Sequence, residues 1–587
     1  MNKKNLTLRE SFAKAVQSFK SKDYKKAEVY CYKILSIDPN HLDSISLLST
    51  IAAINNNFDK AKKLLHQSLE IKPKNTPTLN NLGTIYKESG KFKEAIVFFE
   101  KALKVDVNHV NSNYNLGTTY YKLKDLKKAK FFLKKTVELQ DNYALAFFAL
   151  GNVHVDLKEL HEAVSCYQKT IEIRPDFVNA YNNLGLVFRD LNDFKNAVDS
   201  YEKAIKIKPD YASAHHNLGI ILKEQGDFKK AIQSHELAAK HEPDDLSHYF
   251  FLSDLKKEIL DSNLKIKIND ILKNKSVSVR NKAYGNYLLA RYERSEKNYD
   301  TEFKHLIEGH NNYFNSKKQI FDLAVKYCFT DVIQINEGAK VEKAKSNNNY
   351  EKPIFIVGVP RCGSTLVERI IASGKKIIPI GEESMVMENF INAIILEKQS
   401  LNLGDVNEVG QKISNVYKSK GLVSKKFDYT FTDKSLNNFF YLSLIKDIYP
   451  KAKIINCKRN VLSSIVSIFQ NNLASLAWTH NLENIFKYFD NYFKIIKTFT
   501  EAHPDLIYNL EFEKLVDNPE QETKKLMDYC ELTWDQKCLE FYKRSDLFSK
   551  TASNVQIRQP IYKDSSNKYL PYKKFLSSYG KKYNWFN

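Results

Sequence analysis

Cysteine is scarce in this 587-residue sequence, and no pattern pairs the cysteines that are present. The seven thiols are those of Cys31, Cys166, Cys328, Cys362, Cys457, Cys530 and Cys538. Their number is odd and no two form a C-x-x-C pair, so the spacing indicates neither a disulfide framework nor a zinc site. We therefore expect reduced thiols and no bound metal.

Long apolar runs are also missing. Residues 1–26 carry no apolar core of the signal-peptide type. No stretch is long enough in apolar residues to span a bilayer. We expect a cytoplasmic protein without a membrane span.

The net charge is strongly positive, but the basic residues do not gather in one part of the sequence. Lys and Arg number 90 against 69 Asp and Glu, which gives a net charge of +21. Such a chain can attract nucleic acid, acidic lipid or an anionic small substrate. Because the lysines are spread along the whole sequence, we interpret them as a solvated surface and expect no nucleic-acid partner.

A 34-residue repeat fills the N-terminal part of the sequence. The dipeptide Leu-Gly recurs at this period at Leu82-Gly83, Leu116-Gly117, Leu150-Gly151, Leu184-Gly185 and Leu218-Gly219. Alanine and proline recur in fixed phase with it, and the pattern resembles the tetratricopeptide repeat (TPR). Small residues at these positions predict close approach of the two helices of each hairpin. We predict an all-α superhelix of about seven repeats over residues 12–245, with a groove that stacked hairpins form together.

The repeats indicate a recognition surface without naming its ligand. Asparagines recur at the same period at Asn81, Asn115, Asn183 and Asn217. Their amides offer both a donor and an acceptor, so they could clamp an extended peptide backbone, be hydrated, or hold helix ends. We predict a protein or peptide ligand in the groove.

The pattern changes twice after the repeats. Residues 246–350 keep helical spacing and then become polar, which predicts a helical cap followed by a linker over 336–350. From residue 351, short β-rich runs alternate with helical stretches. This alternation predicts an α/β domain with a parallel sheet over residues 351–587.

A glycine-bearing turn follows the first strand of that domain. Residues 358–365 read GVPRCGST, one residue away from the P-loop pattern G-x-x-x-x-G-K-[ST]. Ser364 stands where the lysine would be, and Arg361 lies three residues earlier. The turn is suited to hold a phosphate, but it lacks the lysine that bridges the β- and γ-phosphates of ATP.

Four segments together resemble a sulfotransferase. They are the turn VPRCGSTL, the Gly381-Glu382-Glu383 motif, the Asp433-Lys434 strand end and the segment CKRNVLSSIVS. The similarity is to the tyrosylprotein sulfotransferase group and its bacterial kin, which take the sulfuryl group from 3′-phosphoadenylyl sulfate (PAPS). It covers residues 352–580 and implies a P-loop-like sulfotransferase domain after the TPR array.

The resemblance also implies roles for individual residues. Arg361 would contact the 5′-phosphosulfate, Glu383 would take the acceptor proton, and Lys434 would support the leaving nucleotide. The spacing leaves open whether Glu382 or Glu383 is the base. The residues assigned to the donor are Arg361, Cys362, Gly363, Ser364, Thr365, Arg459, Ser467, Ser553 and Lys568.

The sequence departs from the family at two places. Phe512 precedes Glu513 where the family has a tyrosine, and Asn471 is neutral where the animal enzymes have a basic residue. A histidine base, as in cytosolic-type sulfotransferases, is disfavoured because His480 and His503 lie outside the motif segments.

These features predict transfer of a sulfuryl group from PAPS to an acceptor hydroxyl without a metal. A tyrosine in a protein recruited by the array is the favoured acceptor, and a glycan or small molecule is the alternative. A P-loop kinase would need Mg²⁺ ligands and the lysine missing at Ser364. A non-enzymatic TPR adaptor with an inactive transferase fold is the remaining class.

Overall fold

The chain forms two compact units, residues 1–217 and 218–587. A computed structural model describes residues 3–342, 348, 351–544, 549, 551, 553–561 and 568–586. Of these residues, no helix combines the length and the apolar character that crossing a membrane requires.

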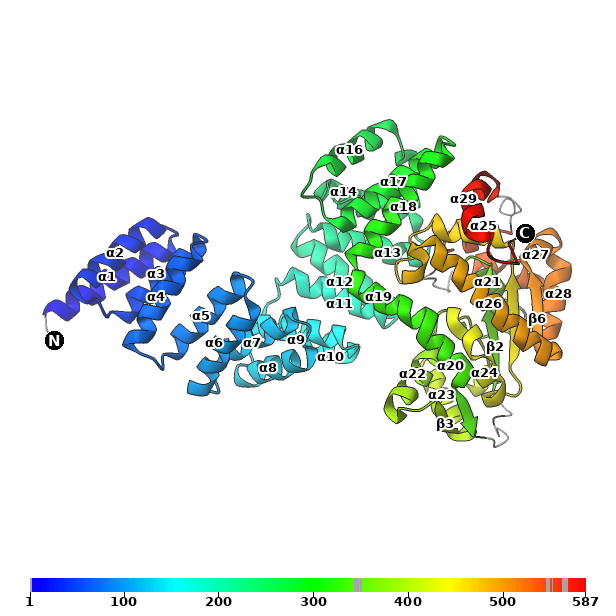
Figure 1. Cartoon of the computed structure of the whole chain (residues 1–587), viewed down its shortest axis with the longest axis horizontal. Coiled ribbons are helices and arrows are strands. Elements are labelled where there is room, and N and C mark those ends of the chain that lie inside the picture. The colour runs from blue at the N-terminus through cyan, green and yellow to red at the C-terminus, as the bar shows by residue number, and fades with distance from the viewer. Residues whose placement is uncertain are drawn as a thin grey trace. The chain divides into compact units, whose positions relative to one another are not determined.

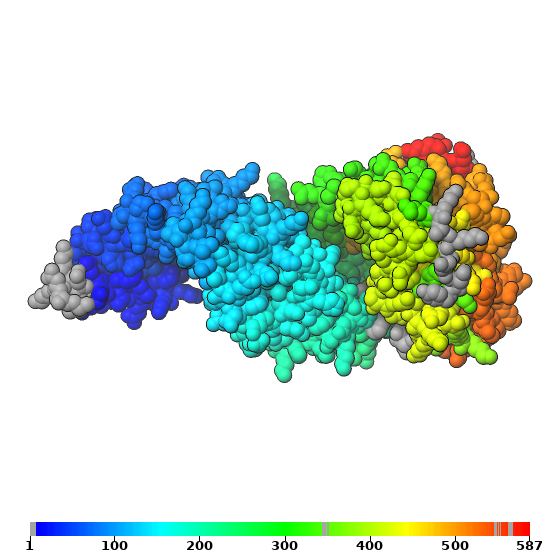
Figure 2. Space-filling view, turned by 90° about the horizontal axis from the view of Figure 1, so that it is seen from below, coloured from blue at the N-terminus to red at the C-terminus, as the bar shows by residue number. Residues whose placement is uncertain are grey.

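The N-terminal unit consists of helical hairpins (Figure 1). Its helices are α1 (Lys3–Lys20), α2 (Tyr24–Ile37), α3 (Leu42–Ile54), α4 (Phe58–Ile71), α5 (Thr76–Glu88), α6 (Phe92–Val105), α7 (Val110–Lys122), α8 (Leu126–Leu139), α9 (Ala144–Asp156), α10 (Leu160–Ile173), α11 (Val178–Asp190) and α12 (Phe194–Ile207). Figure 2 shows the side chains of these hairpins, blue to cyan, as one continuous surface. The predicted all-α repeat array is confirmed.

Each hairpin turns in the same way. One residue between the two helices adopts a left-handed backbone conformation, and it recurs at the repeat period at Lys22, Asn56, Gly90, Lys124, Lys158 and Asn192. In most hairpins an Asp or Asn follows directly, and its side chain accepts a hydrogen bond from a backbone N–H of the second helix. These capping residues are Asp23, Asn57, Asp125 and Asp193. The cap satisfies one of the N–H groups that the first turn of a helix leaves without a partner.

The repeated glycines bring the two helices of a hairpin together. A Cβ atom on Gly151 of α9 would lie 2.7 Å from the ring of Tyr167 on α10, and Gly185 of α11 stands in the same relation to Tyr201 on α12. The close approach predicted from small residues is confirmed. Tyr167 and Tyr201 are fully buried, so these rings belong to the core of the array.

The repeated asparagines link successive hairpins. The Asn217 amide donates to Asn182 Oδ1 at 2.9 Å, and the Asn183 amide donates to Asn152 Oδ1 at 3.1 Å. The Asn115 amide likewise donates to Asn80 Oδ1 at 3.1 Å. These amides therefore hold the first helices of neighbouring repeats in register.

The C-terminal unit begins inside the seventh hairpin. Its helices before the main sheet are α13 (Ala212–Gln225), α14 (Phe228–His241), α15 (Leu246–Ser253), α16 (Ser262–Lys273), α17 (Val279–Ser295), α18 (Tyr299–Ser316), α19 (Lys318–Lys326), a π-helical turn (Tyr327–Asp331) and α20 (Val332–Gly338). The segment predicted as a linker starts within α20 and continues into β1 (Lys340–Glu342), which pairs in parallel with β3 (Asn402–Asp405). Residues 343–347, 349 and 350 lie outside the described residues.

A parallel sheet organises the rest of this unit. Its strand order is β4-β2-β5-β6, with β2 at Lys352–Val357, β4 at Thr430–Asp433, β5 at Lys453–Lys458 and β6 at Ile507–Glu511. All three neighbouring pairs are parallel, so the predicted α/β domain with a parallel sheet is confirmed. β2, β4 and β5 are buried along nearly their whole length, which shows that both faces of the sheet are covered.

Helices supply that cover and the connections. They are α21 (Ser364–Ala372), α22 (Val386–Lys398), α23 (Val406–Ser419), α24 (Leu442–Ile448), α25 (Val461–Phe469), α26 (Leu482–Ala502), α27 (Phe512–Asp517), α28 (Pro519–Tyr529) and α29 (Lys573–Gly580). After β2 the chain next joins this sheet at β4, which lies on one side of the β2–β5 pair. After β5 it next joins the sheet at β6, which lies on the opposite side. In open parallel sheets, ligands bind where such neighbouring connections diverge, at the carboxyl ends of the strands.

Candidate active site

The glycine-bearing turn lies at this point of divergence. It leaves β2 at Val357 and leads directly into α21, whose N-cap is Gly363. Arg361 and Gly363 both have positive φ, at 67° and 99°. A turn of this kind followed by a helix directs backbone N–H groups and the positive helix end toward one place. The turn therefore has the backbone of an anion site.

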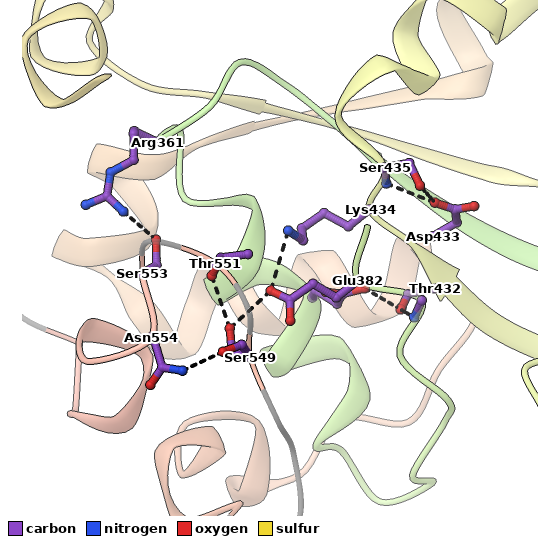
Figure 3. A network of polar contacts seen from close by, with 12 residues as sticks. Arg361, Glu382, Thr432, Asp433, Lys434, Ser435, Ser549, Thr551, Ser553 and Asn554 are labelled. Atoms are coloured by element: carbon purple, nitrogen blue, oxygen red, sulfur yellow. Dashed lines mark hydrogen bonds and ion pairs between the residues drawn. The ribbon is translucent and has the colours of Figure 1, made fainter. Parts of the chain in front are cut away.

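Arg361 connects three parts of the C-terminal unit. Its Nε donates to Ser467 Oγ on α25 at 2.9 Å. Its Nη1 donates to Ser553 Oγ at 2.8 Å (Figure 3). Its Nη2 donates to Gln556 Oε1 at 3.0 Å. Arg459, at the end of β5, donates from Nη1 to the backbone oxygen of Arg361 at 2.8 Å. The structure thus brings four residues predicted for the donor, Arg361, Ser467, Ser553 and Arg459, into one cluster.

Phe512 fills the space that Gly363 leaves open. A Cβ atom on Gly363 would lie 2.5 Å from the Phe512 ring, and the guanidinium of Arg459 lies 4.9 Å from the centre of the same ring. The carboxylate of Glu513 accepts from the backbone N–H of Asn460 at 2.9 Å. The residue pair that departs from the family pattern therefore packs the turn against Arg459, and an aromatic ring suffices for this contact.

Lys434 is a buried cation at the end of β4. Its side chain is 7% exposed, and its Nζ lies 3.6 Å from a carboxylate oxygen of Glu382, which is 12% exposed (Figure 3). Burial lowers the pKa of Lys434, but three carboxylates raise it by more, so the net direction is upward. Those carboxylates, in order of effect, belong to Glu382, Glu368 and Glu383. The lysine stays charged because acidic groups surround it.

The two candidate base residues differ in their surroundings. Glu382 forms a parallel backbone bridge with Lys434 and accepts a hydrogen bond from Ser549 Oγ at 3.2 Å. Glu383 is exposed and has a positive φ of 50°, a conformation that carries strain in a residue other than glycine. Glu382 thus faces the buried lysine, whereas Glu383 faces solvent beside it.

Sequence reasoning missed Asp433 as a positioning group. This carboxylate is fully buried and accepts hydrogen bonds from the Ser384 hydroxyl, the Ser435 hydroxyl and N–H, the Asn438 amide and the Tyr417 hydroxyl. It ties the segment after Glu383 to the end of β4. Its place next to Lys434 was visible in the sequence, but its partners were not.

Glu368 was also missed. It lies one turn into α21 and is buried, and Thr432 Oγ1 of β4 donates to it at 2.7 Å. The same Thr432 oxygen accepts from the backbone N–H of Gly381 at 3.2 Å, so Glu368 supports the segment that carries Glu382. Burial raises the pKa of Glu368 to about 8, although the charge of Lys434 opposes the shift.

The other predicted donor residues occupy varied positions. The thiol of Cys362 is buried beside Cys457, whose hydrogen bond lowers the Cys362 pKa, so only the backbone of Cys362 is available to an anion. Thr365 is buried and Ser364 is half-buried at the start of α21. Lys568 is exposed and follows residues 562–567, which lie outside the described residues.

The histidines lie in other surroundings. His480 packs against His310, with 2.9 Å between their Nδ1 atoms, and burial lowers the pKa of His310 to about 4. His503 Nε2 lies 3.3 Å from Lys446 Nζ. Among the described residues, the group of potential metal ligands that comes together is Glu242, Asp245 and His248, at the start of α15.

Sequence families match both halves of this arrangement. Residues 353–536 match the sulfotransferase family. Residues 18–84 and 214–247 match tetratricopeptide repeats, residues 185–226 match a TPR repeat, and residues 88–170 match subunit 3 of the anaphase-promoting complex, or cyclosome. The chain therefore carries TPR repeats followed by a sulfotransferase-family domain.

Two individual proteins are similar to parts of this chain. An uncharacterized protein of Aquifex aeolicus (strain VF5) is 28% identical over 326 residues, which are 53% of this chain and 42% of that protein. The chain thus spans less than half the length of this relative. A Caenorhabditis briggsae protein named "Putative protein-tyrosine sulfotransferase" is 22% identical over 223 residues, 36% of this chain and 79% of that protein.

Solved structures resemble parts of the chain. The crystal structure of MamA is 30% identical and covers 28% of this chain and 95% of its own, with a TM-score of 0.27. YrrB, described as a TPR protein with an unusual peptide-binding site, is 20% identical and covers 32% of this chain and 95% of its own, with a TM-score of 0.29.

Proposed function

We propose that the chain transfers a sulfuryl group from PAPS to an acceptor hydroxyl. The observation that carries the proposal is the meeting of Arg361, Ser467 and Arg459 at the carboxyl ends of β2 and β5. Two arginines and a hydroxyl at a glycine-bearing turn suit a donor with separate phosphate groups. The match of residues 353–536 to the sulfotransferase family supports this donor.

The donor would lie across the turn and α25. Backbone N–H groups of residues 361–365, with the Ser364 and Thr365 hydroxyls, would hold the 5′-phosphosulfate at the N-terminus of α21. Arg459 and Ser467 would hold the 3′-phosphate. A sulfuryl group carries less charge than a γ-phosphoryl group, which makes a lysine at position 364 less necessary.

In the proposed reaction the Glu383 carboxylate takes the acceptor proton. The acceptor oxygen then forms a bond to sulfur as the bond between sulfur and the nucleotide phosphate oxygen breaks. Lys434 and Arg361 stabilise the charge that develops on the leaving phosphate and the moving group. Glu383 suits the role of general base because it is exposed to an incoming acceptor, whereas Glu382 is paired with Lys434 at 3.6 Å.

Tyrosine in a protein or peptide is the acceptor we favour. A phenol has a pKa of about 10, so it gains from a carboxylate base. The name of the Caenorhabditis briggsae relative and the TPR array, a fold that stacks hairpins into binding surfaces, both favour a protein acceptor. A glycan or small-molecule hydroxyl is the alternative acceptor for the same site.

Transfer of radiolabelled sulfate from PAPS into a cell lysate tests the proposal. We expect the wild type to label a protein band, and we expect Glu383→Gln to reduce labelling about 100-fold or more, within the range of general-base contributions. Glu382→Gln is the comparison variant: it keeps Glu383 and removes the charge that faces Lys434 and Ser549, so it should reduce labelling less than Glu383→Gln does.

Three outcomes would contradict parts of this proposal. Equal labelling by Glu383→Gln and wild type would reject Glu383 as the base. No labelled product with protein, glycan or small phenolic acceptors would reject the activity and leave the adaptor function. Tighter binding of ATP than of 3′,5′-ADP would reject the donor and favour a kinase.

A further inference from the structure

The turn of the seventh hairpin differs from the six before it. Its left-handed residue is Gly226, which continues the series of Lys22, Asn56, Gly90, Lys124, Lys158 and Asn192 at the 34-residue period. Lysine and asparagine adopt this conformation in five of the seven turns. The backbone of the turn therefore does not by itself require glycine at position 226.

A side chain from the C-terminal segment occupies the space beside this glycine. A Cβ atom on Gly226 would lie 2.5 Å from Nε of Arg558, far closer than any real contact. At Gly90, the other glycine of the series, a Cβ atom would meet nothing within 4 Å. Gly226 thus leaves a notch that the guanidinium of Arg558 occupies.

Three groups from the same C-terminal segment hold the end of α13. The backbone oxygen of Glu224 accepts from Arg558 Nη2 at 2.8 Å, from the Asn554 amide at 3.4 Å and from the Ser549 N–H at 3.4 Å. This oxygen belongs to the last turn of α13, where carbonyl groups lack helical partners and a cation is favoured. We call the described residues 549, 551 and 553–558 the strap.

The strap also forms hydrogen bonds with residues of the candidate active site. Gln556 accepts a hydrogen bond from Arg361. Ser553 also accepts one from Arg361, and Ser549 Oγ donates to Glu382 at 3.2 Å (Figure 3). Arg558 is also within electrostatic reach of Glu382. One short segment therefore contacts the last repeat hairpin, Arg361 of the glycine-bearing turn and Glu382.

We propose that Arg558 is a positioning residue, which sits in the notch at Gly226 and fixes the strap so that Ser553 and Gln556 orient Arg361 toward the donor. This inference rests on the proposed function, because the orientation of Arg361 matters only for a bound donor. The seventh TPR hairpin then has a second role as the support of the strap. Arg558 touches no reacting group itself and acts through Arg361.

The repeat series supplies a matched pair of variants. Gly226→Asn installs a residue that the array already uses in this conformation, and its Cβ blocks Arg558. Gly90→Asn makes the same change where the space is open. We expect Gly226→Asn to speed hydrogen exchange of the backbone amides of residues 553–558 and to weaken binding of 3′,5′-ADP about 10-fold or more, the effect of losing a charged hydrogen bond. Gly90→Asn should match the wild type in both measurements.

Variants at Arg558 provide the second test. Arg558→Ala should raise KM for PAPS about 10-fold or more and leave KM for the acceptor unchanged, since only the orientation of Arg361 is lost. Arg558→Lys keeps the cation at the end of α13 and should restore part of the loss. Thermal unfolding followed by tryptophan fluorescence checks that each variant is folded.

The outcomes separate this inference from the proposed function. Unchanged exchange in Gly226→Asn, or faster exchange with unchanged affinity for 3′,5′-ADP and unchanged KM for PAPS, would overturn the positioning role. A rise of KM for the acceptor equal to that for PAPS would also overturn it. A wild type that binds no 3′,5′-ADP would contradict the proposed function, and the exchange comparison would still decide whether Arg558 holds the strap.

Discussion

The repeat array and the α/β domain use polar groups over very different distances along the chain. In the array, the bond from Asn217 to Asn182 joins residues 35 positions apart, and the same kind of bond recurs from hairpin to hairpin. In the candidate active site, Arg361 reaches Ser467 over 106 positions and Ser553 over 192. Contacts between neighbouring repeats spread the stability of the array over many residues. A site built from distant segments depends on a few residues for its geometry.

The two regions also differ in how they hold charge. The ion pair between Lys60 and Glu28 in the array spans 2.9 Å and is 37% and 25% exposed. The pair between Lys434 and Glu382 spans 3.6 Å and is only 7% and 12% exposed. Exposed pairs contribute little to stability, but a buried charge that loses its partner is costly. The comparison therefore predicts unequal responses to the same substitution.

Removal of one lysine from each region gives the largest expected contrast. Lys434→Met should lower the free energy of unfolding of the C-terminal unit by about 3–5 kcal/mol, because it leaves the largely buried carboxylate of Glu382 without the cation that lies 3.6 Å away. Lys60→Met should change the stability of the array by about 1 kcal/mol or less.

Urea unfolding measures both lysine variants. The three tryptophans, Trp478, Trp534 and Trp585, all lie in the C-terminal unit, so their fluorescence reports on that unit alone. Circular dichroism reports on the helices of both units. Similar losses in the two variants would show that the buried pair and the exposed pair are equivalent, against this comparison.

The buried carboxyl of Glu368 should make the C-terminal unit sensitive to pH near neutrality. Burial raises its folded-state pKa to about 8 from an ordinary value of 4.5. Between these pH values the folded state keeps a proton that the unfolded state has released. The contribution of Glu368 to the free energy of unfolding therefore falls as pH rises from about 5 to 8, by up to about 1.4 kcal/mol per pH unit.

A neutral substitution isolates this effect. Glu368→Gln should flatten the part of the pH dependence that tryptophan fluorescence detects, because the amide does not titrate. Any slope shared by both proteins comes from other groups and cancels in the difference. Parallel pH profiles for the two proteins would contradict a raised pKa at Glu368.

Helical glycines offer a contrast of packing. Gly151→Ala in the array places a Cβ 2.7 Å from the Tyr167 ring, and we expect overpacking to cost about 1–3 kcal/mol. Gly410→Ala on α23 has its nearest contact at 3.3 Å, to Ile448, and the gain in helix propensity of up to about 1 kcal/mol should offset it. A Gly151→Ala protein whose array is as stable as the wild type by circular dichroism would show that the hairpins can open to accept the methyl group.

Helix caps should give the smallest effect and the most local one. Asp125→Ala removes the bond to the N–H of Lys128 and should destabilise the array by about 1 kcal/mol. Lys91 holds the same position in another hairpin without a capping bond, so Lys91→Asp should stabilise the array by up to about 1 kcal/mol. Thermal unfolding by circular dichroism measures both, and equal melting temperatures would refute a role for the caps.

The sequence predicts features whose physical cause is short-range or periodic. Small residues at Gly151 and Gly185 repeat every 34 positions and require the close hairpins that the structure shows. The meeting of Arg361 with Ser467 was also accessible, because both follow parallel strands and such ends share one edge of the sheet.

Features that depend on tertiary packing could not be predicted from the sequence. No spacing rule indicates that Thr432 would donate to Glu368, since that bond depends on how α21 lies on β4. The contact of Arg558 with Glu224 spans 334 positions and depends on where the C-terminal segment runs. The assignment of Glu382 and Glu383 to different surroundings likewise follows from the backbone bridge to Lys434.

The notch at Gly226 sets a limit on how this protein can be shortened. The repeat pattern fades after Asp245. A truncation designed from that pattern alone would remove α13 together with the notch at Gly226 that Arg558 occupies. A protein that starts at α13 keeps the notch at Gly226, and one that starts at α15 loses it. Most of the seventh hairpin therefore belongs to the same compact unit, residues 218–587, as the sulfotransferase-family domain.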